Sequence, residues 1–277
     1  MYKRQSSNYA EDLRIDYSIL DQHSESYRKI RNTFRYLLGN LNDVYEDIDL
    51  ENVDIKKLPE LEQFMLHKMY KLNSNFNKYF NNYDFHNLYK ELLNFCTVDL
   101  SAFYFDVRKD TLYCDQKNSE KRKSTIMLLN IILNSLLKWF APILSFTTEE
   151  IYQLMIKENK SIHLEKFLNF PKKFENSALN EKWLQLLKIR DLCNLSIEEK
   201  RANKEIGSSL EASLKVNLDK QSLETVKGID LAELFITSSV EIEKTVSEKI
   251  IVKTNKAKGD KCAVCWKIYL DKCPRHG

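Results

Sequence analysis

The sequence predicts a mainly α-helical protein: an antiparallel helical bundle, then a small α+β module and a short cysteine-rich end. Only five glycines and four prolines occur among 277 residues, which disfavours a protein built from many strands and tight turns. Apolar residues recur at steps of three and four over most of the first 204 residues, as on one face of a helix. Past Gly207 they alternate with polar residues, as on a half-buried strand.

The predicted helices follow one another through modest connections. The first covers about residues 24–41, with Gly39 near its end, and the second follows Pro59. Asp84 and Ser119 are the expected N-caps of the third and fourth helices, because short polar side chains accept hydrogen bonds from free amides at a helix start. Two further helices are predicted, one opened by a capping box from Thr147 to Glu150 and one from Asn180 to about Lys204. Adjacent helices with modest loops favour an antiparallel bundle.

The segment after Gly207 predicts three strands and one short helix. The alternation from Leu210 to Leu218 is the clearest strand, Leu234–Thr237 and Ile250–Val252 are two more, and a helix is expected near Ser222–Val226. The chain is therefore expected to have four parts, a connecting region at 1–58, the helical bundle at 59–204, the α+β module at 205–258 and the cysteine-rich end at 259–277.

Charge and composition say little about a partner. The net charge is only +3, although residues 249–277 hold eight Lys or Arg against two Asp, a local charge of +6. Such a tail can meet phosphates, but a charged run is more often a solvated face. Met1–Gln5 shows no secretory signal, no apolar stretch approaches the length of a membrane span, and six cysteines do not suggest a disulfide framework. We expect a cytoplasmic protein with no membrane and no DNA partner.

One constellation points to specific chemistry. Two residues separate Cys262 from Cys265, and after seven further residues Cys273 and His276 repeat that spacing. Zinc takes four sulfur or nitrogen ligands at tetrahedral corners, and two such tight turns fill all four positions. A redox C-x-x-C pair is the alternative, but no thioredoxin-like unit is apparent around it. The pattern therefore predicts a structural Zn²⁺ site, a zinc knuckle that folds a segment too short for its own core.

No catalytic residue is predicted. The histidines outside the knuckle are scattered, and neither a phosphate-binding Walker loop nor a dinucleotide fingerprint occurs. Arg28, Arg31 and Arg35 follow helical spacing and predict one basic stripe, with a solvated helix face as the alternative. The lack of a catalytic motif, together with this basic stripe, indicates a binding protein and not a complete enzyme.

Several segments, taken in order, resemble isoleucyl-tRNA synthetases of the class I type. They are Ser6–Ile15, Tyr27–Arg35, Leu37–Leu41, Tyr83–His86, Val98–Tyr104, Ala141–Thr147, Glu149–Ile151, Ile206–Ala212 and the terminal knuckle. The resemblance covers about residues 6–277. It implies an anticodon-binding bundle with a zinc-binding tail, in an enzyme that uses ATP to attach isoleucine to its tRNA.

Three departures from the family qualify this expectation. The adenylate-forming signatures, the editing domain and the N-terminal zinc sites are absent, so the catalytic part is expected upstream and this chain alone is expected to be inactive in aminoacylation. ATP would then matter only in the full-length enzyme. Met1–Gln5 match nothing in the family. The fourth zinc ligand of the family is commonly Cys, whereas here it is His276, next to the last residue.

The resemblance makes the anticodon arm of tRNA the expected partner, and a monomer the expected state. The candidates for phosphate contact are Arg28, Arg31, Arg35, Lys121, Arg122 and Lys123. Trp266 is a candidate for stacking on a base, and the alternative is that it packs over the knuckle. Three other interpretations stay open: the equivalent part of a valyl, leucyl or methionyl enzyme, a stand-alone zinc-stabilised RNA-binding protein, and a scaffold that binds proteins.

Overall fold

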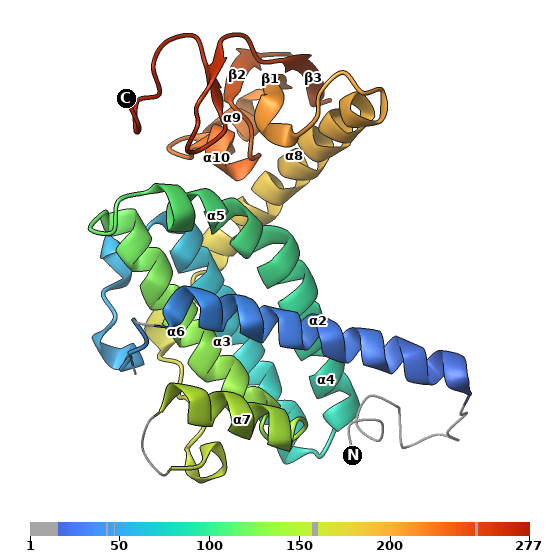
Figure 1. Cartoon of the computed structure of the whole chain (residues 1–277), viewed down its shortest axis with the longest axis vertical. Helices are drawn as coiled ribbons and strands as arrows, with labels where there is room; N and C mark the ends of the chain where they lie inside the picture. The colour runs from blue at the N-terminus through green and yellow to red at the C-terminus, as the bar shows by residue number, and fades with distance from the viewer. Residues whose placement is uncertain (1–15, 43, 47, 157–159, 247–248) are drawn as a thin grey trace. The chain divides into compact units, whose positions relative to one another are not determined.

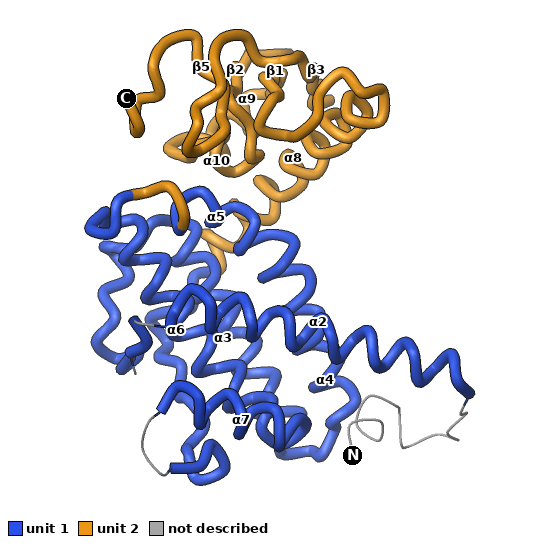
Figure 2. Tube along the Cα trace, viewed as in Figure 1, with its two compact units in different colours: residues 1–112, 116–176 blue, residues 113–115, 177–277 orange. Residues whose placement is uncertain are grey.

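The computed structural model describes residues 16–42, 44–46, 48–156, 160–246 and 249–277. The resemblance at Ser6–Ile15 and the departure at Met1–Gln5 therefore lie outside the described residues. The chain forms two compact units, coloured separately in Figure 2. The first unit comprises residues 1–112 and 116–176, and the second comprises residues 113–115 and 177–277. The four-part division expected from the sequence stays a prediction.

The first unit is a bundle of helices (Figure 1). Its elements are α2 (Tyr17–Leu41), α3 (Glu60–Asn81), α4 (Phe85–Asn94), a π-helical segment (Phe95–Tyr104), α5 (Phe105–Cys114, which belongs to this unit as far as Leu112), α6 (Glu120–Phe140), α7 (Ser145–Met155) and the 3₁₀ turns Leu50–Asn52, Ile55–Lys57, Ile162–Leu164 and Lys172–Phe174. α6 contacts α2, α3 and α7, while α4 packs on α3 and the π-helical segment packs on α2. The mainly helical class is confirmed.

Helix α6 lies at the centre of this bundle. Every residue from Leu128 to Phe140 is buried, so this stretch is surrounded by protein on all sides. The polar members are bonded, as where the Trp139 indole Nε1 donates to Asn73 Oδ1 at 3.1 Å. Because a helix buried all round shows no single apolar stripe, the sequence pattern reveals this helix but not its central position. None of the helices in the described part of the chain is long and apolar enough to cross a membrane.

The helix starts show which capping predictions hold. Asp84 accepts from the Asn87 amide and Ser119 from the Arg122 amide, both at 3.2 Å, so these two N-caps are confirmed. The capping box from Thr147 to Glu150 is wrong, because α7 already begins at Ser145. The Ile143 and Leu144 amides donate to the Phe140 carbonyl, and this turn leads directly into the helix, whose N-cap is Leu144, three residues before the expected Thr147.

The second unit combines one long helix with a small sheet. Its elements are α8 (Ser177–Ala202), a 3₁₀ turn (Ser209–Glu211), β1 (Ala212–Leu218), α9 (Lys220–Val226), α10 (Leu231–Leu234), β2 (Ser239–Lys244), β3 (Ile251–Lys256), β4 (Asp260–Lys261) and β5 (Ile268–Tyr269). The sheet order is β2–β1–β3, with β1 parallel to β2 and antiparallel to β3. α8 packs on β3 and α9, and alternate residues of β1 are buried. The α+β module is confirmed.

The second predicted strand, Leu234–Thr237, is wrong. Asp230 caps a short helix by accepting from the Glu233 amide at 3.0 Å, and α10 runs to Leu234. Ile236 then has a left-handed backbone, with φ of +56°, which a strand cannot contain. The strand that pairs with β1 comes later, at β2. Because β2 lies at a sheet edge and five of its six residues are exposed, it lacks the alternation that marks a strand in the sequence.

Candidate metal centre and basic surfaces

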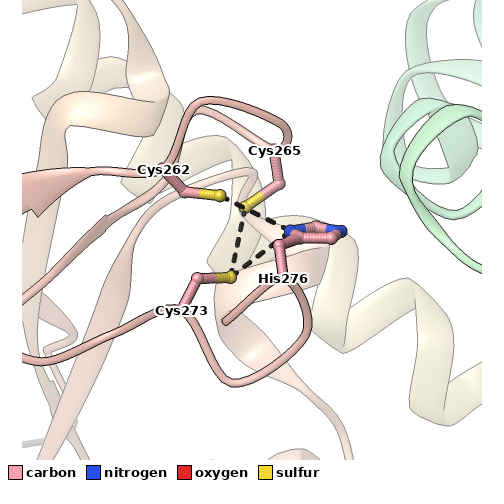
Figure 3. Close-up of side chains that lie close together, drawn as sticks. All are labelled: Cys262, Cys265, Cys273 and His276. Carbon is pink, nitrogen blue, oxygen red and sulfur yellow. Dashed lines mark hydrogen bonds between the residues drawn. The ribbon is translucent and has the colours of Figure 1, made fainter.

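The first pair of predicted ligands lies on the β4–β5 hairpin. The two strands pair antiparallel, so the chain between them closes into a tight turn that contains Cys262 and Cys265. The Cys262 amide donates to the Lys267 carbonyl at 2.9 Å, and the Trp266 amide donates to the Cys262 carbonyl at 3.0 Å. These two bonds fix the turn, so that both sulfurs are presented on its inner side (Figure 3).

The second pair lies on a turn at the end of the chain. The amides of His276 and Gly277 donate to the Cys273 carbonyl at 3.3 and 3.0 Å, which curls the chain around Cys273. Figure 3 shows the four side chains of Cys262, Cys265, Cys273 and His276 converging on one centre. The structure therefore brings together all four residues that the spacing predicts as ligands.

The distances among these side chains suit a tetrahedral metal ion. Cys265 Sγ lies 3.9 Å from Cys273 Sγ, and His276 Nδ1 lies 3.5 Å from Cys262 Sγ and 3.4 Å from Cys273 Sγ. A tetrahedron built on ordinary zinc bond lengths has edges of about 3.8 Å between sulfurs and about 3.6 Å between sulfur and nitrogen. All four ligand atoms lie within 4.8 Å of one another. The group can hold a metal ion, and the donor set fits.

Backbone amides around the first turn prepare one of the thiols for this role. The amides of Cys265 and Val264 donate to the sulfur of Cys262 and lower the pKa of that thiol to about 6. Since a metal binds the thiolate rather than the thiol, Cys262 is ready to bind at neutral pH.

The second ring nitrogen of His276 lies beside a backbone carbonyl. His276 Nε2 is 3.1 Å from the oxygen of Cys114, and the neighbouring Arg275 Nη1 is 2.8 Å from Asp115 Oδ1. Residues 113–115 belong to the same compact unit as the knuckle. Because a carbonyl only accepts, Nε2 must carry the proton, and Nδ1 is left with its lone pair facing the sulfurs.

Trp266 keeps more than half of its surface exposed, 58%, although it lies between two candidate ligand turns. Its neighbours Val264 and Leu270 are also exposed, and Lys261 Nζ lies 5.9 Å from the centre of the indole ring. An exposed ring beside a cation can accept a stacked base, so stacking by Trp266 stays a prediction beside the alternative that the ring packs over the knuckle.

The three arginines of the predicted stripe line one open cavity of about 880 Å³ between α2 and α7. Arg28 is paired with Glu25 at 2.7 Å. Arg31 Nη1 donates to the Tyr27 hydroxyl at 3.3 Å. Among the described residues, no hydrogen bond or ion pair of the Arg35 side chain is found. The cavity therefore presents three cations from one helix face.

The second basic group lies on the first turn of α6. Lys121, Arg122 and Lys123 follow each other there, and Lys123 is paired with Glu120 at 2.9 Å. Cations are unfavourable at a helix N-terminus, where the backbone dipole is positive, so this placement breaks a local rule of helix stability. Such breaks are expected at functional positions. None of the three lines the arginine cavity, so the two basic groups are separate surfaces of the first unit.

Two features of these sites are not visible in the sequence pattern. Glu150 lines the arginine cavity, 4.0 Å from Arg31, and Thr147 bonds the Tyr27 hydroxyl at 2.8 Å. Their position next to the basic face depends on the packing of α7, which no local pattern reveals. The Cys114 carbonyl beside His276 is a backbone atom, and any residue type supplies one.

A helical bundle followed by a small α+β module with a four-ligand cluster is the arrangement expected above for the anticodon-binding part of a tRNA ligase. Residues 62–217 match the sequence family described as the anticodon-binding domain of tRNA ligase, and the chain belongs to that family.

Longer curated proteins are also similar to this chain. The isoleucine–tRNA ligase of Pelagibacter ubique is 68% identical over 271 residues, which cover 98% of this chain and 30% of that protein. The isoleucine–tRNA ligases of Kosmotoga olearia and Bartonella henselae are 38% and 36% identical, over 98% and 96% of this chain. The chain thus spans about 30% of the length of the curated relatives it matches.

Proposed function

We propose that this chain is the part of an isoleucine–tRNA ligase that holds the anticodon arm of isoleucine tRNA. The observation that carries the proposal is the family match at residues 62–217, joined to 68% identity with an isoleucine–tRNA ligase over 98% of the chain. The relatives reported above are all isoleucine–tRNA ligases, which favours an isoleucine tRNA over the valine, leucine or methionine tRNAs. In the whole ligase, isoleucine is activated with ATP and transferred to the tRNA, by parts of the enzyme that this chain does not span.

The arginine cavity on α2 is the proposed contact with the tRNA backbone. A guanidinium neutralises a phosphate and donates two parallel hydrogen bonds to it. Arg28, Arg31 and Arg35 are three and four residues apart on one helix, so their side chains reach the same groove. Glu25 and Glu150 lie beside two of these cations, Arg28 and Arg31, so an arriving phosphate would compete with the two carboxylates for them. Lys121, Arg122 and Lys123 are proposed to contact a second stretch of backbone.

The terminal knuckle is the proposed contact with an unstacked base of the anticodon loop. The exposed indole of Trp266 offers a flat apolar surface, and Lys261 adds a positive charge next to it. Bases in single-stranded loops are recognised by stacking of this kind.

Zn²⁺ is the ion that the four ligands suit best. It binds three thiolates and one imidazole nitrogen, and its role is structural, because the four protein atoms leave no position for water or substrate. The ligands would be Cys262, Cys265, Cys273 and His276. By fixing the two turns, they hold Trp266 in its exposed position.

A binding titration with matched variants tests the tRNA contact. Replacing Arg28, Arg31 and Arg35 together by Ala should weaken binding of an isoleucine tRNA transcript and reduce the salt dependence, by about 0.7–0.9 in slope for each phosphate that the protein no longer neutralises. Arg201→Ala is the control, since Arg201 is an exposed arginine of α8 paired with Glu198 at 2.6 Å. An unchanged affinity and slope in the triple variant would remove the arginine cavity from the proposal.

A further inference from the structure

His276 differs from the three cysteines of the cluster because it has a second polar atom. Its Nδ1 faces the sulfurs of Cys262 and Cys273, at 3.5 and 3.4 Å, while Nε2 lies 3.1 Å from the carbonyl oxygen of Cys114. The ring therefore lies between the ligand cluster and the segment Tyr113–Asp115, and each of its nitrogens has a partner on a different side.

Two other contacts join the same segment to the knuckle. Arg275 and Asp115 form an ion pair at 2.8 Å, in which the carboxylate is 14% exposed. The Cys114 thiol lies 3.7 Å from the carbonyl of Val264, on the first ligand turn. Three contacts from three knuckle residues thus converge on Cys114 and Asp115, and they involve both turns of the knuckle.

A metal ion on Nδ1 changes the contact made by Nε2. Without metal, only hydrogen bonds keep the proton on Nε2 and hold the ring, so the proton can move to Nδ1 and the ring can rotate about its side-chain bonds. With metal on Nδ1, the proton must be on Nε2, the ring is held in place, and the N–H bond is more polarised. Each of these effects strengthens the hydrogen bond to the Cys114 carbonyl.

We propose that the Cys114 carbonyl is an outer-shell acceptor for the metal centre, so that metal binding fastens the knuckle onto Tyr113–Asp115 and covers the Cys114 thiol. The proposal rests on metal binding at the four ligands. Cysteine at position 276 would also complete a zinc site, but a metal-bound thiolate has no proton to donate to the carbonyl. The histidine at this position therefore adds a positioning contact that a four-cysteine knuckle lacks.

Cys114 is itself the probe for this contact. A tryptic peptide from Asp110 to Lys117 contains Cys114 as its sole cysteine, so its alkylation by iodoacetamide can be followed by mass spectrometry. The rate is measured on the whole chain, with one equivalent of Zn²⁺ and after removal of metal by a chelator, with metal content determined in parallel. His276→Cys is the matched variant, because it keeps four ligand side chains but has no second polar atom to donate to the Cys114 carbonyl.

In the wild-type chain, Zn²⁺ should slow alkylation of Cys114 by about tenfold, the effect of one hydrogen bond of ordinary net strength on an opening equilibrium. In zinc-loaded His276→Cys, this protection should be largely absent. Equal protection in both loaded proteins would overturn the proposal, and so would an unprotected Cys114 in wild-type protein that holds one zinc. A wild-type chain that binds no Zn²⁺ would overturn the metal assignment as well.

Discussion

Glu62 of α3 and Arg108 of α5 form a bidentate ion pair in the interior of the first unit. Nε of Arg108 lies 2.6 Å from Oε1 of Glu62, and Nη2 lies 2.6 Å from Oε2. The Glu62 side chain is fully buried and that of Arg108 is 3% exposed. The Tyr104 hydroxyl donates to the same carboxylate at 3.1 Å, and burial, together with the Glu62 charge, raises the pKa of this tyrosine well above its usual value. The pair thus joins α3 to α5, and the Tyr104 hydroxyl adds the π-helical segment to the same carboxylate.

Breaking this pair on one side should strongly destabilise the first unit. Glu62→Gln leaves Arg108 buried without its counter-charge, and the expected loss is about 3–5 kcal/mol of unfolding free energy. Hydrogen exchange of the most protected amides in α3 and α6 measures this quantity for the first unit alone. Glu198→Gln is the comparison, because its exposed pair with Arg201 contributes little, and a similar small effect of both substitutions would contradict the prediction.

A buried histidine should make the first unit sensitive to pH. His67 is 3% exposed, and its Nδ1 accepts from the Asn176 amide at 2.9 Å. Burial, assisted by the charge of Lys71, lowers the pKa of His67 below its usual value of 6.5. The neutral ring therefore adds stability that is fully present above pH 6.5 and is lost as the pH falls toward the lower folded-state pKa.

The substitution that isolates this effect is His67→Asn, which keeps an acceptor near the position of Nδ1 but does not titrate. Between pH 7 and pH 5 the exchange-derived stability of α3 should fall more steeply in the wild-type chain than in the variant. Parallel pH profiles in the two proteins would show that His67 is not the group responsible.

The knuckle should depend on one glycine. Gly259 has a φ of +118°, and a Cβ there would lie 2.0 Å from the carbonyl oxygen of Tyr269 on the facing strand. Gly259→Ala must therefore push β4 away from β5 and spread the ligand turn, so zinc affinity in a competition titration should fall. Gly39→Ala is the control, since a Cβ at Gly39 meets nothing within 4 Å and its site lies in α2, where alanine should stabilise the helix by about 0.5–1 kcal/mol. Equal zinc affinity in both variants would be the contrary result.

If Trp266 stacks on a base, its removal should weaken tRNA binding without changing the salt dependence. Stacking contributes about 1–3 kcal/mol per base, so Trp266→Ala should cost between about five- and 150-fold in affinity. Trp266→Phe keeps an aromatic face and should recover part of it. If zinc-loaded Trp266→Ala binds tRNA with unaltered affinity, the indole ring does not take part in tRNA binding.

Local signals in the sequence are sufficient for most helices and for the ligand cluster. Asp84 and Ser119 cap their helices as expected, because a cap needs only the side chain and the amides that follow it. Cys262 and His276 are recognisable from spacing alone, because short ligand spacing is a property of the turns themselves.

The features that the sequence does not predict depend on contacts between distant residues. The Glu62–Arg108 pair joins residues 46 positions apart, and neither residue type suggests burial. The edge strand β2 carries no alternation, so its pairing with β1 is not visible and the sequence predicts the strand too early, at Leu234–Thr237. The Cys114 carbonyl is placed by the fold of the second unit and has no counterpart in the residue pattern.

Whether this chain selects isoleucine tRNA can be measured from the retention of total tRNA by the purified, zinc-loaded chain. The tRNAs held on a filter at moderate salt are identified by sequencing and compared with the input. We expect enrichment of isoleucine tRNA over valine, leucine and methionine tRNAs. Retention of all tRNAs in their input proportions, or of none, would contradict it.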